Sequence, residues 1–277
     1  MGHLHPRPGL ILLVTVFVAL SSACFGLDEP FTFAVVADPH TAETARWRVD
    51  EYGSHMDRFF RCVEQMKGLP ASERPDFLLI CGDIHLWELQ KRMDEIEIPL
   101  HVIAGNHASA DRKREMRELF PNDFQIDGKP ADYYSFRHKG VLFIGMCDAA
   151  TGDHVGHLAS EDIHPRGQSE WLERELHRPE QQKFLFAHIP PHPEGRDENM
   201  YLSRNDSRFL LDLVRETQPT AMFFGHQHSA TREDTFGVTR SFTVRSCAWN
   251  FQDVPLGFLL VNIGKDGVDV REMLTSE

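Results

Sequence analysis

The sequence predicts an α/β fold, because short strand-like runs alternate with helix-like stretches along most of the chain. Six apolar runs rich in Phe, Val and Ile each stop at a polar or glycine-containing turn, at residues 31–38, 76–83, 100–107, 141–148, 183–191 and 221–228. Amphipathic stretches predict helices between these runs, at residues 53–68, 111–120, 168–177 and 203–217. Runs that are apolar throughout are typical of strands buried on both faces of a sheet.

Three other segments have the pattern of antiparallel hairpins, at residues 132–145, 240–251 and 255–274. The sequences HKG at 138–140 and GKDG at 264–267 are suitable turns. We therefore expect antiparallel strands beside the α/β core.

The longest stretch without clear periodicity is 149–167. A loop of this length in a compact domain is usually a functional lid or an insertion. Its histidines, His154, His157 and His164, are most simply explained as solvated loop residues.

Length and composition fit one domain. A chain of 277 residues with 41% hydrophobic residues can bury a sizeable core, and no repeat, low-complexity tract or long linker divides it. We expect a single domain over residues 31–277. The 42 acidic side chains outnumber the 29 basic ones, and no basic patch stands out, so nucleic acid is an unlikely partner.

The amino-terminal residues have the order of a secretory signal peptide. Arg7 lies in a short start, an apolar run follows at 10–20, and small residues come next. This run is shorter than the ~20 residues that span a bilayer. We expect cleavage after Ala23, export to the periplasm or outside the cell, and no transmembrane segment in the mature chain. Lipid attachment at Cys24 is a weaker alternative, and a buried amino-terminal strand or helix is another.

Four cysteines follow Cys24, and their spacing forms neither a disulfide framework nor a C-x-x-C pair. These are Cys62, Cys81, Cys147 and Cys247, and we expect most of them to be buried apolar residues.

Five of the apolar runs are followed by residue types that bind hard or borderline divalent metals. These residues are Asp38, His40, Asp83, Asn106, His107, His188, His226 and His228. Functional groups of α/β proteins collect at the carboxyl ends of the strands, so segments far apart in sequence can converge there. Imidazole, carboxylate and amide oxygen together suit Zn, Fe or Mn.

Each motif alone has an ordinary structural explanation. Asp38 with His40 fits a polar cap at a strand end, and a single His188 is more often a satisfied buried histidine than a ligand. GNH is more specific, because Gly105 permits a sharp turn. GHQH at 225–228 places two imidazoles where they can serve adjacent positions of a metal centre. Together the segments are a strong signal, because every structural explanation would have to hold independently.

The order D-x-H, GD, GNH, H and GHxH, from Asp38 to His228, resembles the calcineurin-like metallophosphoesterases. The resemblance implies a four-layer α/β/β/α sandwich of two mixed β-sheets flanked by helices. It also implies two divalent or trivalent metal ions (Mn, Fe or Zn) at the carboxyl ends of the strands. The implied activity is hydrolysis of phosphomonoester or phosphodiester bonds in a small-molecule substrate by a metal-activated water.

The resemblance assigns three ligands to each metal and one ligand to both. The ligands of the first metal are Asp38, His40 and His228. The ligands of the second metal are Asn106, His188 and His226. The bridging carboxylate is Asp83. His107 matches the family's non-ligand histidine, which contacts the scissile phosphate or protonates the leaving group.

Two departures from the family pattern matter. The family commonly follows GNH with Asp or Glu, which orients the catalytic histidine, but this chain has Ala108. His107 therefore lacks that partner or borrows another, such as Asp111. Purple acid phosphatases carry a tyrosine after GD, and the sequence GDIHLWE at 82–88 has none, which excludes that subgroup.

Four further residues near these motifs are candidates for contact with substrate. His85 and His192 would line the pocket or lie on the surface. Arg112 and Arg114 follow GNH closely and could touch phosphate, but the arginine directly after the motif in protein phosphatases is absent.

Two functions from different classes fit the sequence. The first is an exported two-metal phosphoesterase, and the compact build and HIPPH at 188–192 favour the small phosphodiesterase-type members. The alternative is a non-catalytic metal-binding scaffold protein with the same fold. Degenerate members usually lose ligands, whereas all seven ligand positions are present here, so the enzyme is the preferred hypothesis.

Overall fold

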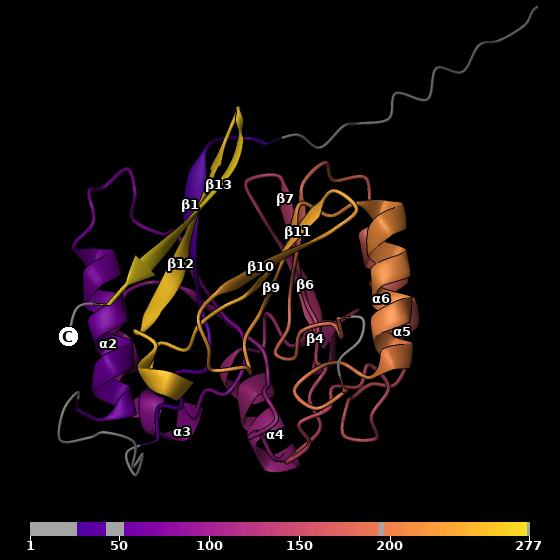
Figure 1. The fold of residues 1–277 in the computed structure, drawn as a ribbon, viewed down its shortest axis with the longest axis horizontal. Coiled ribbons are helices and arrows are strands. Elements are labelled where there is room, and N and C mark those ends of the chain that lie inside the picture. The colour runs from indigo at the N-terminus through magenta and orange to yellow at the C-terminus, as the bar shows by residue number, and fades with distance from the viewer. Residues whose placement is uncertain (1–26, 43–52, 194–196, 276–277) are drawn as a thin grey trace, which may run out of the picture.

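The computed structural model describes residues 27–42, 53–193 and 197–275. The expected signal peptide at 1–23 and Cys24 lie outside these residues. Two mixed β-sheets lie between helices in the described part of the chain (Figure 1). A search of these ranges for a helix long and apolar enough to cross a membrane finds none.

The first sheet has five strands in the order β13-β12-β1-β2-β3. The strands β1, β2 and β3 are parallel, whereas β12 pairs antiparallel with both β1 and β13. In the register of this sheet, Ala34 of β1 lies between Leu78 of β2 and Leu260 of β12. The bounds are β1 Phe31–Val36, β2 Leu78–Ile80, β3 Leu100–Val102, β12 Gly257–Gly264 and β13 Gly267–Leu274.

The second sheet has six strands in the order β10-β11-β9-β8-β7-β6. Its four central strands are parallel, and the edge strands β6 and β10 are antiparallel to their neighbours. The bounds are β6 Tyr134–His138, β7 Val141–Gly145, β8 Lys183–Phe186, β9 Ala221–Phe224, β10 Arg232–Phe236 and β11 Thr239–Thr243. A separate small hairpin joins β4 (Gln125–Ile126) and β5 (Lys129–Pro130).

Helices cover the outer sides of the two sheets. Figure 1 shows α2 beside the first sheet and α5 with α6 at the opposite side of the molecule. The longest helices begin at serines whose side chains accept a backbone hydrogen bond, Ser54 for α2 and Ser203 for α6. The bounds are α2 His55–Lys67, α3 Leu86–Leu89, η1 Gln90–Glu95, α4 Ala110–Leu119, α5 Gln168–Leu176, α6 Arg204–Thr217 and η2 Phe251–Asp253.

Aromatic rings fill the space between the two sheets. Phe33 of β1 stacks on Phe77, which precedes β2, with centroids 5.4 Å apart. Three rings of the second sheet meet the ring of Phe33 edge to face. They belong to Phe143, Phe184 and Phe223, with centroids 5.2, 5.5 and 5.9 Å from that of Phe33. Edge-to-face contacts of this kind add to the burial of apolar area. The predicted sandwich of two mixed sheets flanked by helices is thereby confirmed.

Most elements agree with the sequence predictions, and the exceptions are short or exposed. The predicted hairpins at 132–145 and 255–274 are β6–β7 and β12–β13. The prediction at 240–251 is wrong beyond residue 243, because β11 ends there and pairs back with the unpredicted strand β10. The short helices α3 and η1 were also not predicted. The four described cysteines are free and buried, as expected.

Candidate active site

The eight candidate residues lie in the loops at the carboxyl ends of β1, β2, β3, β8 and β9. Parallel strands in both sheets point these ends toward one region, which brings five segments of the chain together. The seven expected ligands are all buried. His107, the expected non-ligand, has a 54% exposed side chain. Burial therefore separates the two classes of residue that the sequence analysis proposed.

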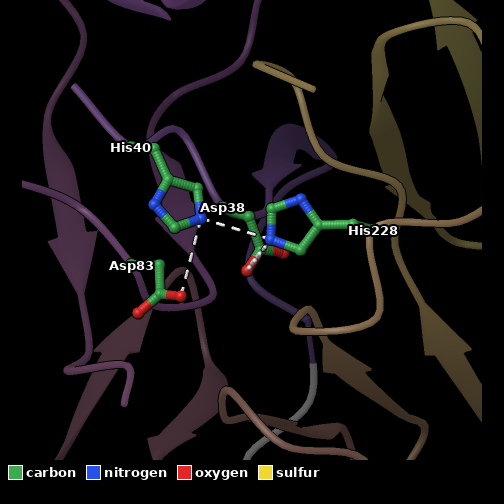
Figure 2. Close-up of side chains that lie close together, drawn as sticks. All are labelled: Asp38, His40, Asp83 and His228. Carbon is green, nitrogen blue, oxygen red and sulfur yellow. Dashed lines mark hydrogen bonds and ion pairs between the residues drawn. The ribbon is translucent and has the colours of Figure 1, made fainter. Parts of the chain in front are cut away.

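The first group of side chains surrounds His40 (Figure 2). Its Nε2 atom lies 3.2 Å from Nε2 of His228 and 3.6 Å from Oδ2 of Asp83. Asp38 completes the group, with Oδ1 3.4 Å from Nε2 of His228. One ligand atom from each of these four residues lies within 4.8 Å of the others, so the group could hold a metal ion.

The second group surrounds His188. Its Nε2 atom lies 3.1 Å from Oδ1 of Asn106 and 3.1 Å from Nδ1 of His226. Oδ2 of Asp83 is 3.4 Å from the same Nε2 atom. Asp83 therefore contacts both groups through one oxygen.

Backbone carbonyls fix the ring tautomers of three histidines. Nδ1 of His188 lies 2.9 Å from the oxygen of Cys81, and Nδ1 of His228 lies 2.8 Å from the oxygen of Trp249. Nε2 of His226 lies 3.3 Å from a carbonyl oxygen in the loop 149–167. A carbonyl can only accept, so each of these nitrogens carries the hydrogen. When the ring is neutral, its other nitrogen has a free lone pair directed into the cluster.

Glycines allow this close packing. A Cβ atom at Gly225 would lie 2.5 Å from Oδ2 of Asp38, and one at Gly82 would lie 2.3 Å from Nδ1 of His188. Gly82 also has a φ of +84°, a conformation that side chains rarely adopt. The glycines of GD and GHQH are thus required by the geometry of the cluster.

The electrostatics of the cluster combine burial with close opposite charges. Burial would lower the pKa of His188, but the charges of Asp83 and Asp38 outweigh it and raise that pKa to about 10. Burial would raise the pKa of Asp83, yet the charge of His188 holds it well below its usual range. Burial and the charge of His188 lower the pKa of His226 to about 3. The buried carboxylates are thus ionised and balanced by histidine protons, which divalent cations can replace.

His107 stands at the edge of the cluster. Its backbone N–H donates to Oδ1 of Asp83 at 3.1 Å, and its Nε2 atom lies 3.8 Å from Oδ2 of the same residue. Its ring also meets the ring of His40, with centroids 5.1 Å apart. Asp111, suggested from the sequence as a substitute partner, instead forms an ion pair with Arg114, and its side chain is 75% exposed. That suggestion is therefore wrong in this conformation.

The other candidates for substrate contact lie outside the cluster. Arg112 forms an ion pair with Glu115 on α4. His85 is half-buried, with its ring centroid 5.9 Å from that of a metal-ligand candidate, His40. His192 packs edge-on against Tyr201 at 5.6 Å. None of these three candidates lines the cavity described below.

Sequence reasoning missed two residues that shape the site. Asp148 follows β7 and accepts backbone hydrogen bonds from His188 at 3.2 Å and from Ile189 at 3.0 Å. The run 141–148 already ended in this aspartate, so its position was a usable signal. Trp249 stacks on the His228 ring, with centroids 3.9 Å apart, and no local pattern marked it.

A cavity of about 950 Å³ opens beside the cluster. Five of the candidate residues line it, namely Asp83, Asn106, His107, His226 and His228. The remaining lining residues come from the segments 197–201, 227–232 and 249–251, and from His154 in the loop 149–167. Gln227 is one of them, and it bonds to the oxygen of Met200 and to Arg232 rather than to the cluster. The cavity is large enough for a small organic ligand.

Comparisons with known proteins agree with this geometry. The calcineurin-like phosphoesterase family model matches residues 31–230. A probable cyclic nucleotide phosphodiesterase of Rhodococcus erythropolis is 26% identical over 79% of this chain and 73% of its own. A cAMP/cGMP dual specificity phosphodiesterase of Mycobacterium tuberculosis is 24% identical over 88% of this chain and 69% of its own.

Among solved structures, a dimetal phosphatase from Danio rerio has the same fold, with a TM-score of 0.60 and 16% identity. The similarity covers 89% of this chain and 99% of that one. The family model, the two mixed sheets and the buried cluster of metal-ligand residues all lead to one assignment. The chain belongs to the calcineurin-like phosphoesterases, a family of hydrolases that use a dinuclear metal centre.

Proposed function

We propose that the protein is an exported phosphodiesterase that hydrolyses small phosphodiesters at a dinuclear metal centre, with cyclic nucleotides as the first candidate substrates. The observation that carries this proposal is the position of Asp83. Its Oδ2 atom lies 3.6 Å from Nε2 of His40 and 3.4 Å from Nε2 of His188, so it faces both groups of ligand candidates. A carboxylate shared in this way suits a pair of metal ions.

The residues present fit two divalent ions. Each group offers imidazole nitrogens with oxygen donors, a set that suits Mn, Fe or Zn. The first ion would be held by Asp38, His40 and His228, the second by Asn106, His188 and His226, and both by Asp83. When bound, the ions would polarise the phosphoryl oxygens and lower the pKa of a water that attacks phosphorus.

His107 is the proposed general acid. Its exposed side chain lines the cavity, whereas the seven ligand candidates are buried. The bond from its backbone N–H to Asp83 ties its position to the shared carboxylate. An imidazole held there can donate a proton to the leaving alkoxide.

The charge of the cavity favours diesters over monoesters. Among the described residues that line the cavity, Arg232 is the only lysine or arginine, and its Nε donates to Asp234 at 2.7 Å. Asp197 adds a further acidic group to the lining. A monoester carries about one more negative charge than a diester at pH 7. Beyond the metal centre, the described residues of the lining offer little to bind that charge. The two phosphodiesterase relatives support the same choice.

The metal-loaded protein tests the proposal. We expect Mn²⁺-loaded protein to release nitrophenol from bis(p-nitrophenyl) phosphate faster than from p-nitrophenyl phosphate, and to hydrolyse 3′,5′-cyclic nucleotides. His107→Ala should keep two bound metals and lose about 100-fold or more in kcat. Asp83→Asn should lose both metal and activity. The exposed His177, which pairs with Glu216 far from the cavity, supplies the control variant His177→Ala.

Two results would contradict the proposal. Bound metal without turnover of any ester would favour the non-catalytic scaffold instead. Full activity in His107→Ala would remove the role given to that residue.

Export is supported by the sequence of residues 1–23 alone. Its test is the amino terminus of the protein recovered from the periplasm or medium. We expect a start at Cys24, with or without lipid. Intact protein that begins at Met1 and stays in the cytoplasm would exclude export.

A further inference from the structure

Two aromatic residues form one side of the cavity. Trp249 stacks on the His228 ring at 3.9 Å, and Phe251 meets Trp249 nearly perpendicularly at 4.9 Å. Four large apolar side chains are exposed in the described part of the chain, and of these only Phe251 lines the cavity. Its side chain is 49% exposed. Together the two rings form an apolar surface that lines the cavity beside the metal-ligand cluster, which indicates a surface for a ligand.

The segment that carries these two rings is held firmly. The backbone N–H of Phe251 donates to the oxygen of His228 at 2.8 Å. The Asn250 side chain accepts from the N–H of Ser246 at 2.9 Å and donates to its oxygen at 3.1 Å. Directly after Phe251, Gln252 has a φ of 57°. Such strained backbone persists only where surrounding contacts maintain it. The structure around Phe251 therefore maintains its exposed position.

Other residues that line the cavity favour a neutral partner for these rings. Arg232 lies over the Tyr201 ring at 5.8 Å, and it donates to Gln227 and Asp234. Because Asp234 pairs with the guanidinium of Arg232, this side chain offers hydrogen-bond donors rather than unpaired charge to a ligand. Uncharged hydrogen-bonding groups, including the side chain of Asn199, also line this part.

We propose that Trp249 and Phe251 form an aromatic subsite that binds the nucleobase of a nucleoside phosphodiester, with the base stacked against Phe251. This inference rests on the proposed function and names the substrate class of the same site. Trp249 touches a proposed metal ligand directly, so a base held beside it can be joined by its ribose to a phosphate at the centre. Nucleobases stack on aromatic side chains with little dependence on sequence.

Binding of two ligands that differ only in the base tests the subsite without turnover. We would titrate Mn²⁺-loaded protein with AMP and with ribose 5-phosphate by calorimetry. Wild-type protein should bind AMP about fivefold or more tightly than ribose 5-phosphate. Phe251→Ala should lose most of this preference for AMP, and Phe251→Trp should regain it. Trp87→Ala, which alters an equally exposed aromatic residue outside the cavity, is the matched control and should retain the wild-type ratio.

Kinetics supply the second readout. In Phe251→Ala the loss should fall on KM for 3′,5′-cyclic AMP rather than on kcat, and the KM for glycerophosphocholine should not rise. Three results would overturn the subsite. The first is a wild-type protein that binds AMP and ribose 5-phosphate with equal affinity, and the second is an equal loss of affinity for both in Phe251→Ala. The third is an equal rise in KM for cyclic AMP and for glycerophosphocholine in that variant. If wild-type protein bound AMP much more tightly than ribose 5-phosphate but hydrolysed no ester, the subsite would be supported and the proposed function contradicted.

Discussion

Strained backbone at single residues positions the proposed ligands. Asp38, His40, Asp83, His226 and His228 have φ values of 51°, 41°, 49°, 71° and 45°. A non-glycine residue in this region costs on the order of 1 kcal/mol or more. Hydrogen bonds within the cluster offset that cost, since the N–H of His226 donates to the Asp38 carboxylate at 2.9 Å. Side chains from separate loops therefore reach one point because the turns beneath them are sharp.

Gly105 provides the first test at this scale. A Cβ atom there would lie 2.1 Å from Oδ1 and 2.5 Å from the backbone nitrogen of Asp83. Because backbone must move to admit it, we expect Gly105→Ala to lower the free energy of unfolding by about 1–3 kcal/mol and to weaken metal binding. Urea denaturation and metal titration measure the two effects. Gly264→Ala, where the nearest atoms are 3.9 Å away, should change neither. Equal metal affinity in both variants would contradict the crowding argument.

The site residues differ in how far sequence could predict them. His226 and His228 were predictable because their side chains carry the chemistry and their spacing is fixed in one motif. Trp249 was not, because its contribution is a carbonyl oxygen and a ring face, and neither depends on a local pattern. Asp148 acts through hydrogen bonds to the backbone N–H groups of His188 and Ile189, so only its own place at the end of the run 141–148 could have indicated it.

At the scale of elements, apolar strands and strands joined by a marked turn were predictable, whereas short or charged elements were not. β9 is buried along its whole length, and its sequence is a continuous apolar run. β10, with the sequence REDTF, is a partly exposed edge strand rich in charge, which is how proteins protect a sheet edge. Gln252 and Asp253 of η2 adopt positive φ although neither is a glycine, so no turn signal marked this element. Apolar runs therefore fail to indicate a strand with a charged sequence, whereas the exposed β13 was predictable from the GKDG turn before it.

The start of α5 holds the loop 149–167 in place. Gln168 is buried, and its side chain accepts from the N–H of Cys147 at 2.8 Å. It also donates to the oxygens of Cys147 at 2.7 Å and Leu158 at 3.0 Å. The loop in turn supplies the carbonyl of His154 that fixes the tautomer of His226. One side chain thus connects a helix, a strand end and the site.

Replacement of this glutamine tests the connection. Gln168→Leu would leave a buried N–H and two carbonyls without this partner, and we expect a loss of about 2–4 kcal/mol in the free energy of unfolding. Gln125→Leu removes an exposed glutamine with a single bond to the oxygen of Asn122, and should change stability by less than about 0.5 kcal/mol. Chemical denaturation measures both variants. Equal stabilities would show that the loop does not depend on α5.

For the whole molecule, the two-sheet core and the metal cluster contribute to stability separately. The hydrophobic core between the sheets contains none of the proposed metal ligands. The cluster, in contrast, buries Asp38 and Asp83 against histidines whose protons compete with metal. The raised pKa of His188, about 10, means that its ring is protonated at neutral pH in the metal-free protein. Metal binding must displace this proton, so affinity should increase as pH rises toward 10.

Removal of metal should therefore lower the melting temperature without abolishing the fold. A ligand present at about 1,000 times its Kd stabilises the native state by roughly 4 kcal/mol, which corresponds to about 10 °C for a chain of this size. We expect that shift between Mn²⁺-loaded and chelator-treated protein in a thermal scan, with recovery when Mn²⁺ is restored. Asp83→Asn should show almost no shift, because the carboxylate facing both groups is lost. If wild-type protein melted at the same temperature in both states, the cluster would not be a tight metal site.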